Sequence, residues 1–314
     1  MKILVTGGAG FIGSHLSEAL VKAGHRVRVL DNFHSGQRAN LAAVRSDVEI
    51  LKGDCGDPRA AARAVKGVEV VYHEAAIPSV ARSVADPAGS HAANASASLT
   101  MLIAARDAGV RRFIYAGSSS IYGESPTLPK RESMTPEPLS PYAVAKLLGE
   151  HYLRVFCRLY GMQGLTLRYF NVFGPRQDPT SPYSGVISLF ATTLRDGRTP
   201  LIFGDGGQTR DFTYVANVVR GNLLALRAKR AAGQSINLAT GRRISLRVLL
   251  REMAKLTGRP AKATYRPVRA ADIRHSLADI TLARRVLGYA PIVRFEDGLR
   301  ETVAWYRSRR PGRS

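Results

Sequence analysis

A tyrosine and a lysine four residues apart, Tyr142 and Lys146, could carry acid–base chemistry. Residues at i and i+4 lie on the same face of a helix, so both side chains can reach one substrate. A free phenol has a pKa of about 10 and is a poor base at neutral pH. A neighbouring cation favours the phenolate, so Lys146 beside it would let Tyr142 act as a general base. The same spacing also arises by chance on amphipathic helices.

Three consecutive serines, Ser118, Ser119 and Ser120, follow an apolar run that ends at Ala116. Hydroxyls at the carboxyl end of a buried parallel strand lie where ligands bind. Serine-rich turns also satisfy backbone groups without any chemistry. We expect Ser118 to contact a substrate, and both interpretations stay open for Ser119 and Ser120.

A glycine-rich turn at residues 7–13, Gly-Gly-Ala-Gly-Phe-Ile-Gly, comes directly after the first apolar run. Glycines at this spacing allow a tight turn and close approach of a pyrophosphate, and the helix that follows offers free N–H groups. Asp31 ends the second apolar run, where a carboxylate can accept hydrogen bonds from an adenosine ribose. A carboxylate there repels a 2′-phosphate, so the sequence predicts NAD rather than NADP. The positive nicotinamide ring of bound NAD⁺ would then join Lys146 in favouring the Tyr142 phenolate. Asp54 follows the third run and either contacts the adenine amino group or caps the next helix.

The elements that position these residues alternate along the first half of the chain. Apolar runs without polar alternation predict buried parallel strands at residues 2–6, 26–31, 48–53, 68–73, 112–116 and 165–170. Helical patterns lie between them at residues 11–23, 58–65, 88–107 and 141–160. This order predicts an α/β fold, a doubly wound, Rossmann-like parallel sheet with right-handed connections. We expect Ser140 to cap the last of these helices, with Pro141 at its first position.

The second half of the chain is mixed. We expect residues 1–173 to form the NAD-binding domain and residues 174–314 to form most of a smaller α/β substrate domain, with an interleaved boundary. Predicted helices there are 186–196, 215–230, 246–256, 282–287 and 295–306, and predicted strands are 200–203, 235–238 and 263–266.

Charge and cysteine content restrict the class of protein. The 314 residues carry 46 Lys and Arg against 24 Asp and Glu, a net charge of +22 that suits an anionic ligand or nucleic acid. The basic residues are scattered and no aromatic–basic motif accompanies them, so we do not expect a nucleic-acid partner. Two distant cysteines, Cys55 and Cys157, suit a reducing compartment, and no apolar run is long enough for a membrane span. We predict a cytoplasmic protein without a metal site, in which His73 orders the loop after its strand.

Several further motifs occur in a fixed order along nearly the whole chain. They are Gly7-x-x-Gly10-x-x-Gly13, Asp31-Asn32, His73-x-Ala75-Ala76, the serine turn at 118–123, Tyr142-x-x-x-Lys146, residues 168–175 (Arg-Tyr-Phe-Asn-Val-Phe-Gly-Pro) and residues 204–212 (Gly-Asp-Gly-Gly-Gln-Thr-Arg-Asp-Phe). This set resembles the extended short-chain dehydrogenases/reductases of the nucleotide-sugar epimerase/dehydratase group, and most closely the UDP-glucose 4-epimerases.

The resemblance implies roles for individual residues. Ser118 would hydrogen-bond the sugar O4, Tyr142 would be the base, and Lys146 would hold the nicotinamide ribose and tune the tyrosine. Residues expected to bind NAD are Gly7, Gly10, Phe11, Ile12, Gly13, Asp31, Asn32, Gly36, Asp54, Cys55, Ala75, Ala76, Asn94, Tyr142, Lys146 and Phe170. Residues expected to bind a UDP-sugar are Ser118, Ser119, Tyr142, Asn171, Arg210, Arg269 and Ser276.

The resemblance also separates the reactions of the group. Its dehydratases and decarboxylases carry a carboxylate in the turn after the catalytic Ser or Thr, where this chain has Ser119 and Ser120. We therefore expect a 4-epimerase that works through a 4-keto sugar. Some relatives have a bulky Tyr where this chain has Ser276, so an N-acetylated sugar would also fit.

Two alternatives remain. One is a UDP-glucuronate epimerase or another nucleotide-sugar dehydrogenase or dehydratase. The other is an NAD-sensing, nucleic-acid-associated regulator, which only the net charge supports. Helices 88–107 and 141–160 carry apolar residues beyond one stripe, which suits either a homodimer that buries them in a four-helix bundle or burial within one chain.

Overall fold

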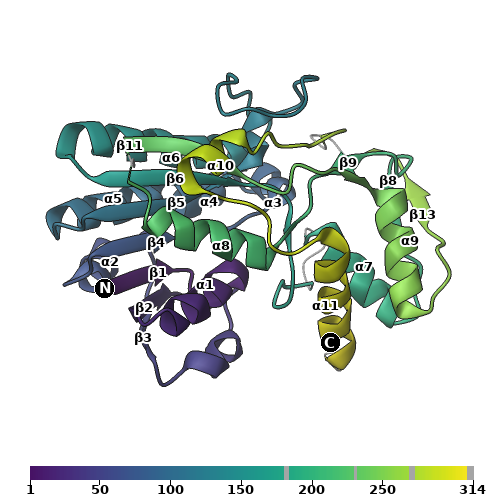
Figure 1. Ribbon diagram of the computed structural model, residues 1–314, viewed down its shortest axis with the longest axis horizontal. Helices are drawn as coiled ribbons and strands as arrows, with labels where there is room; N and C mark the ends of the chain where they lie inside the picture. The colour runs from purple at the N-terminus through teal and green to yellow at the C-terminus, as the bar shows by residue number, and fades with distance from the viewer. Residues whose placement is uncertain (180–183, 230–231, 269–272, 310–314) are drawn as a thin grey trace.

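A seven-stranded parallel sheet forms the centre of the larger lobe in the computed structural model, which describes residues 1–179, 184–229, 232–268 and 273–309 (Figure 1). In spatial order the strands are β11 (Ala232–Leu238), β6 (Gln163–Tyr169), β5 (Arg112–Ser118), β4 (Val70–His73), β1 (Lys2–Thr6), β2 (Arg26–Asp31) and β3 (Val48–Lys52). Every neighbouring pair is parallel. The doubly wound α/β fold predicted from the sequence is confirmed.

Helices cover both faces of this sheet (Figure 1). One face packs against α1 (Phe11–Lys22), α8 (Val215–Leu226) and α10 (Thr281–Leu287). The other packs against α2 (Pro58–Val65), α5 (Ala97–Asp107) and α6 (Pro141–Tyr160). Within β1, Ile3 and Val5 face the first layer and Leu4 faces the second. Burial on both faces explains why these strands read as continuous apolar runs.

The seventh strand, β11, comes from the second half of the chain. It pairs with β6, and α8 from the same half covers the sheet. The larger lobe therefore takes residues from both sides of position 173. An interleaved boundary is compatible with this arrangement, and the division at residues 173 and 174 stays a prediction.

The helix predicted at residues 88–107 is wrong as a single α-helix. The chain forms α4 (Pro87–His91), a π-helical turn (Ala92–Ser96) and then α5. The Ser98 hydroxyl donates to the Asn94 carbonyl in this turn, and one inserted residue turns Asn94 toward the preceding loop. Two short elements, α3 (Val80–Ala85) and a 3₁₀ helix (Arg38–Val44), were not predicted. They are too short to produce a clear apolar period.

A smaller lobe lies beside the carboxyl ends of the central strands (Figure 1). Its helices are α7 (Val186–Arg195), α9 (Leu246–Thr257) and α11 (Phe295–Ser308), and its short strands are β7 (Val172–Phe173), β8 (Leu201–Phe203), β9 (Thr209–Arg210), β10 (Thr213–Tyr214), β12 (Ile244–Ser245) and β13 (Thr264–Arg266). Phe173 is the centre of its core, with Phe212, Tyr214 and Phe295 at ring-centroid distances of 5.5 to 6.3 Å. These aromatic contacts fix the lobe directly after β6.

Polar contacts tie the first helix to the segment after β7. The His15 ring lies 3.0 Å from the Pro175 carbonyl, and Arg176 forms an ion pair with Glu18 at 2.6 Å. Both contacts start from α1, so the glycine turn that precedes this helix has a fixed position relative to the smaller lobe. In the described part of the chain, no helix combines the length and apolar character that crossing a membrane requires.

Candidate active site

The glycine turn between β1 and α1 is packed too closely to admit side chains at Gly7 and Gly13. Gly7 has φ +64°, and a Cβ on Gly13 would lie 2.2 Å from the Gly7 carbonyl oxygen. Gly10 precedes α1, and among the described residues no side chain caps this helix. The first N–H groups of α1, around Phe11 and Ile12, therefore face a backbone cradle that suits a pyrophosphate.

Asp31 lies beside this turn at the end of β2. Its carboxylate accepts hydrogen bonds from the backbone amides of Ala9, at 2.9 Å, and Phe33, at 2.8 Å. A Cβ on Gly36 would lie 2.8 Å from both carboxylate oxygens. Gly36 therefore packs directly against the carboxylate. Because each oxygen has further lone pairs, the carboxylate can still accept hydrogen bonds from ribose hydroxyls.

Asp54 does not cap a helix, so that alternative is wrong. Asp57 caps α2 by accepting from the Arg59 amide at 2.9 Å. Asp54 instead accepts from Asn32 Nδ2 at 2.7 Å, which joins the ends of β2 and β3 at the carboxyl edge of the sheet. Cys55 is buried in the core, and burial raises the pKa of its thiol to about 12. Contact of Asn32, Asp54 and Cys55 with the cofactor stays a prediction.

His73 orders the loop after β4, as the sequence suggested. Its Nδ1 lies 2.8 Å from the Thr6 hydroxyl, which accepts from the Ala75 amide at 3.2 Å. Its Nε2 lies 3.0 Å from the Ser98 hydroxyl. Burial lowers the pKa of His73 to about 3, so the ring is neutral at physiological pH. The imidazole therefore connects β1, α5 and the loop that contains Ala75 and Ala76.

Asn94 fixes the other end of this loop. Its Oδ1 accepts from the Ile77 amide at 3.0 Å, and its Nδ2 donates to the Ser90 carbonyl at 2.9 Å. Phe170, also expected at the cofactor, is fully buried after β6 and packs against Tyr122. Asn94 thus holds the loop through backbone groups, and contact of Asn94 and Phe170 with the cofactor stays a prediction.

The three expected catalytic residues come together at the carboxyl end of β5. Ser140 caps α6 by accepting from the Ala143 amide at 3.2 Å, as predicted, which starts the helix just before Tyr142. Lys146 Nζ donates to the Ala116 carbonyl at 2.9 Å. Two residues further on, Ser118 ends β5 with its hydroxyl 2.9 Å from that of Ser120.

Burial controls the charge of these groups. It raises the pKa of Tyr142 to about 12, against the hydrogen bond with Ser118, which lowers it. It also lowers the pKa of Lys146 to about 8, against the nearby Glu74 carboxylate, which raises it. In the protein alone Tyr142 is therefore a neutral phenol at pH 7. The lowering of its pKa that the sequence suggested requires a further positive charge in the site.

The expected substrate residues gather around Asp211, which the sequence analysis did not single out. Its fully buried carboxylate accepts from Thr240, through both amide and hydroxyl, and from the amides of Gly241 and Ala278. Asn171 Nδ2 donates to the Asp211 carbonyl at 3.4 Å. One carboxylate thus holds three segments together beside Arg210.

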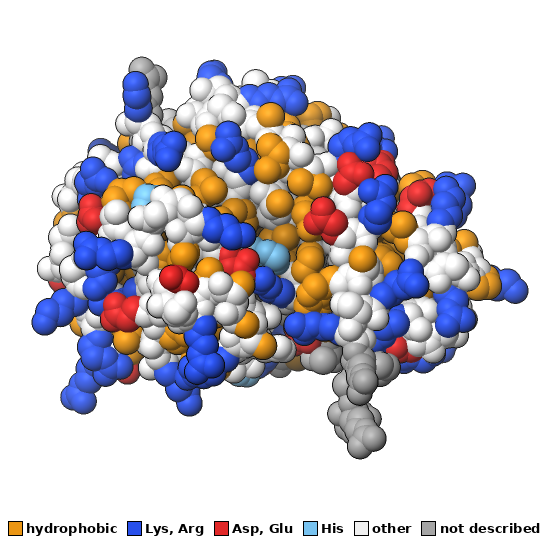
Figure 2. All heavy atoms as spheres, turned by 60° about the horizontal axis from the view of Figure 1, so that its bottom comes forward, with side chains coloured by type: hydrophobic (Ala, Val, Ile, Leu, Met, Phe, Trp, Pro, Cys, Tyr) orange, Lys and Arg blue, Asp and Glu red, His pale blue; other side chains and the backbone are white. Residues whose placement is uncertain are grey.

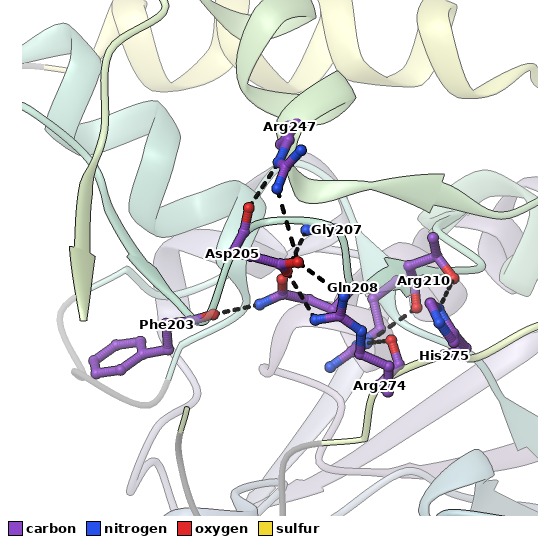
Figure 3. A network of polar contacts seen from close by, with 9 residues as sticks. Phe203, Asp205, Gly207, Gln208, Arg210, Arg247, Arg274 and His275 are labelled. Atoms are coloured by element: carbon purple, nitrogen blue, oxygen red, sulfur yellow. Dashed lines mark hydrogen bonds and ion pairs between the residues drawn. The ribbon is translucent and has the colours of Figure 1, made fainter. Parts of the chain in front are cut away.

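Arg210 and Ser276 lie on adjoining backbone. Arg210 donates to the Thr209 carbonyl at 3.0 Å, and the Ser276 amide donates to the same carbonyl at 3.0 Å. Figure 3 shows Arg210 with His275 and Arg274 beside it. Arg269, also expected to bind the substrate, lies outside the described residues.

A second cluster near Arg210 was also not predicted. Arg274 binds both carboxylate oxygens of Asp205, at 2.7 and 2.9 Å, and Arg247 donates to the Asp205 carbonyl at 2.7 Å (Figure 3). The Arg274 guanidinium holds the pKa of Asp205 well below its usual range. These contacts stabilise the glycine-containing turn that leads to Arg210.

Basic side chains are interspersed with others on the face of the molecule that Figure 2 shows, and the absence of a nucleic-acid partner stays a prediction. Figure 2 shows Lys and Arg side chains spread over the visible face among acidic, polar and apolar ones. Among the residues that the structure describes, no group of three or more His, Cys, Asp or Glu side chains could hold a metal ion. The absence of a metal from the reaction stays a prediction.

Comparisons with known proteins find relatives that cover nearly the whole chain. The model of the NAD dependent epimerase/dehydratase family matches residues 3–239. A UDP-glucose 4-epimerase of Mycolicibacterium smegmatis is 40% identical over 313 residues, which cover 98% of this chain and 99% of that protein. The UDP-glucose 4-epimerase of Thermotoga maritima, solved with UDP-glucose, has a TM-score of 0.94 and 39% identity, with 98% and 99% of the two chains covered. The UDP-N-acetylglucosamine 4-epimerase of Methanobrevibacter ruminantium, solved with UDP-N-acetylmuramic acid, has a TM-score of 0.93 and 38% identity, with 97% of each chain covered.

Proposed function

The chain belongs to the NAD-dependent epimerase/dehydratase family, and we propose that it catalyses the 4-epimerisation of a UDP-hexose through a 4-keto intermediate. Membership confirms the family resemblance seen in the sequence, NAD as cofactor, and an enzyme of the epimerase/dehydratase class. UDP-glucose and UDP-galactose are the substrates that we propose, with the N-acetylated pair as an extension.

The hydroxyl side chains in the turn after β5 support epimerisation rather than dehydration. Ser118 and Ser120 pair hydroxyl to hydroxyl at 2.9 Å, and Ser119 lies between them. Loss of water from a sugar needs an acid to protonate the leaving hydroxyl. Epimerisation needs only a base at O4 and a hydride acceptor. A turn with hydroxyls at positions 118–120 therefore supports the second reaction.

The glycine turn and Asp31 fit a dinucleotide, because a tightly packed turn without side chains and the uncapped start of α1 lie beside a carboxylate held by backbone amides. When bound there, NAD would supply the acceptor and then the donor of the C4 hydride. Ser118 would hydrogen-bond the sugar O4, and Tyr142 would take and later return its proton. The positive pyridinium ring adds the charge that favours the Tyr142 phenolate.

The anchor for the nucleotide diphosphate would be Arg210 and Asn171, which β9 and the end of β6 hold in place. Arginine suits this task because its planar guanidinium binds two phosphate oxygens at once. The 4-keto sugar must turn to present its other face while the diphosphate stays bound. These anchors must therefore bind more tightly than the sugar pocket does.

The surface of α5 and α6 supports a homodimer. Ile103 on α5 is 39% exposed, and Val144, Val155 and Leu159 on α6 are 43%, 47% and 65% exposed. Apolar side chains on two packed helices favour a second copy that completes a four-helix bundle. We propose this symmetric contact for the protein in solution.

Incubation with UDP-glucose, UDP-N-acetylglucosamine and UDP-glucuronate in separate tubes, followed by proton NMR, tests the function. We expect conversion of UDP-glucose to its C4 epimer up to a fixed equilibrium ratio. A 4-keto-6-deoxy product would show dehydration instead. Conversion of the glucuronate alone would show that the enzyme is a uronate epimerase.

A further inference from the structure

Glu74 is a carboxyl group at the active site that the proposed reaction does not use. It follows His73 at the end of β4, and His73 pairs with Tyr115 on β5. The next residues along the two parallel strands are Glu74 and Ala116. The Ala116 carbonyl accepts a hydrogen bond from the Lys146 ammonium. Glu74 therefore lies one strand away from the residue that binds the lysine.

One hydrogen bond, supported by a second from a neighbouring helix, holds the carboxyl in place. The Tyr169 hydroxyl, at the end of β6, donates to Glu74 Oε1 at 2.8 Å. Asn222 on α8 donates from Nδ2 to the Tyr169 hydroxyl at 2.8 Å, and its own carbonyl accepts from Tyr72 at 2.9 Å. Glu74 therefore has a fixed position, set by a chain of hydrogen bonds that spans β4, β6 and α8.

Lys146 is the cation whose charge acts on the Glu74 carboxyl. Burial raises the pKa of Glu74 to about 7, and the Lys146 ammonium lowers it. The other titratable groups that face it are the Tyr169 and Tyr72 phenols, whose pKa values burial raises further above the ordinary value. The His73 ring is neutral at physiological pH because burial lowers its pKa. Each of Glu74 and Lys146 thus stabilises the charged form of the other.

We propose that Glu74 is a positioning residue that acts through Lys146: fixed by Tyr169, its carboxylate keeps the lysine ammonium charged and bound to the Ala116 carbonyl. This inference rests on the proposed function only in taking Lys146 as part of the catalytic machinery. A lysine in so buried a place loses its proton easily, and a neutral amine neither attracts the phenolate nor donates three hydrogen bonds. Glu74 therefore extends the active range of the site toward alkaline pH.

The direct test measures the charge of Lys146 in the full-length, cofactor-free protein. The chain has nine lysines, so NMR titration of ¹³Cε-labelled lysine resolves them, and Lys146→Arg identifies the signal. In Glu74→Gln the amide oxygen can still accept from Tyr169, but the negative charge is lost. We expect the Lys146 pKa to fall by about one unit or more in this variant. An unchanged Lys146 pKa would overturn the proposal.

Two further variants separate this effect from a loss of structure. Tyr169→Phe removes the donor that favours the carboxylate, so it should shift the Lys146 pKa in the same direction by a smaller amount. Glu69→Gln makes the same chemical change just before β4, where Glu69 accepts from the Lys2 amide, and should leave Lys146 unaffected. A shift of equal size in Glu69→Gln would contradict a local role for Glu74.

The pH profile of turnover gives the functional result. In Glu74→Gln the loss of activity at alkaline pH should begin at lower pH than in the parent protein. A shifted Lys146 pKa in a protein that turns over no UDP-sugar would support the charge coupling and reject the proposed function. A parent-like Lys146 pKa in Glu74→Gln, with full epimerase activity, would reject the charge coupling and support the proposed function.

Discussion

Lys146 donates from Nζ to the carbonyl oxygen of Ala116 over 2.9 Å. This bond fixes the start of α6 against the end of β5, because Lys146 lies one helical turn after Tyr142 and Ala116 lies two residues before Ser118. A phenol, a hydroxyl and an ammonium from two elements therefore meet at the edge where parallel strands bind ligands. The arrangement makes the contribution of each group testable.

Tyr142→Phe removes the proposed general base and leaves the ring that packs in the site. General base catalysis contributes about a hundredfold or more to the rate, so turnover of UDP-glucose should fall by at least that factor. Binding of UDP, measured by calorimetry, should stay nearly unchanged. Tyr160→Phe, at the exposed end of the same helix, is the control. Parent-like epimerisation by Tyr142→Phe would refute the assignment of the base.

Gly13→Ala tests whether the glycine turn holds the dinucleotide. The new Cβ would lie 2.2 Å from the Gly7 carbonyl oxygen, a backbone atom that cannot move without opening the turn. Such overpacking costs about 1–3 kcal/mol, so the affinity for NAD should fall about tenfold or more. Calorimetric titration of the cofactor-free protein measures this affinity.

Gly24→Ala is the matched control for that experiment. Gly24 has φ +79°, so alanine strains the backbone, but a Cβ there meets nothing within 4 Å. This variant should lose about 1 kcal/mol of stability and keep the parent affinity for NAD. Equal loss of NAD binding in both variants would mean that Gly13 acts through general stability alone.

The sequence predicts most of the fold and the local part of the site. Buried parallel strands produce apolar runs, and Tyr142 and Lys146 are joined by one helical turn, so both features are visible in short windows. The hydrogen bonds of Asp211 to Thr240 and of Arg274 to Asp205 join residues 29 and 69 positions apart. No local pattern reports such contacts, because tertiary packing alone brings the partners together.

The sequence contained a signal for Glu74 as a site residue, although no role was predicted for it. It stands inside the His73-x-Ala75-Ala76 motif, at the variable position, and is a charged residue at the carboxyl edge of a buried strand. Burial of a carboxyl group is costly without a partner. Its partners, Tyr169 and Lys146, are visible only once β4, β5 and β6 lie side by side.

His73 should make the protein less stable in mild acid. Its pKa is lowered to about 3 in the folded protein, against an ordinary value of 6.5, so between these values the unfolded chain binds one more proton. The contribution of His73 to the free energy of unfolding therefore falls by about 1.4 kcal/mol per pH unit as the pH drops below about 6. Urea denaturation at pH 7, 6 and 5 measures the slope.

His73→Gln provides the comparison, since glutamine is polar and does not titrate. Its free energy of unfolding should depend less steeply on pH over this range, although it is lower at pH 7 because the bonds to Thr6 and Ser98 change. Identical slopes for the two proteins would show that His73 is not the source of the acid sensitivity.

Leu159→Glu tests the proposed dimer surface on α6. Leu159 is 65% exposed in one chain, so the substitution costs little in a monomer. In a symmetric bundle it would bury a carboxylate without a partner, at a cost of more than about 2 kcal/mol. Light scattering after size-exclusion chromatography should then give a monomer mass. Ile292→Glu, 62% exposed outside α5 and α6, should keep the parent mass. A monomeric parent protein would refute the dimer outright.

Ser276→Tyr tests whether a small side chain widens the sugar pocket. The Ser276 amide donates to the Thr209 carbonyl, so a larger side chain at this position must extend from a fixed backbone beside Arg210. A clash of about 1.4 kcal/mol is enough for a tenfold change, so epimerisation of UDP-N-acetylglucosamine should fall about tenfold or more. UDP-glucose lacks the acetyl group and should be turned over at nearly the parent rate. Ser276→Ala keeps the pocket wide and should retain both activities, so an equal loss of both in Ser276→Tyr would place Ser276 outside the sugar pocket.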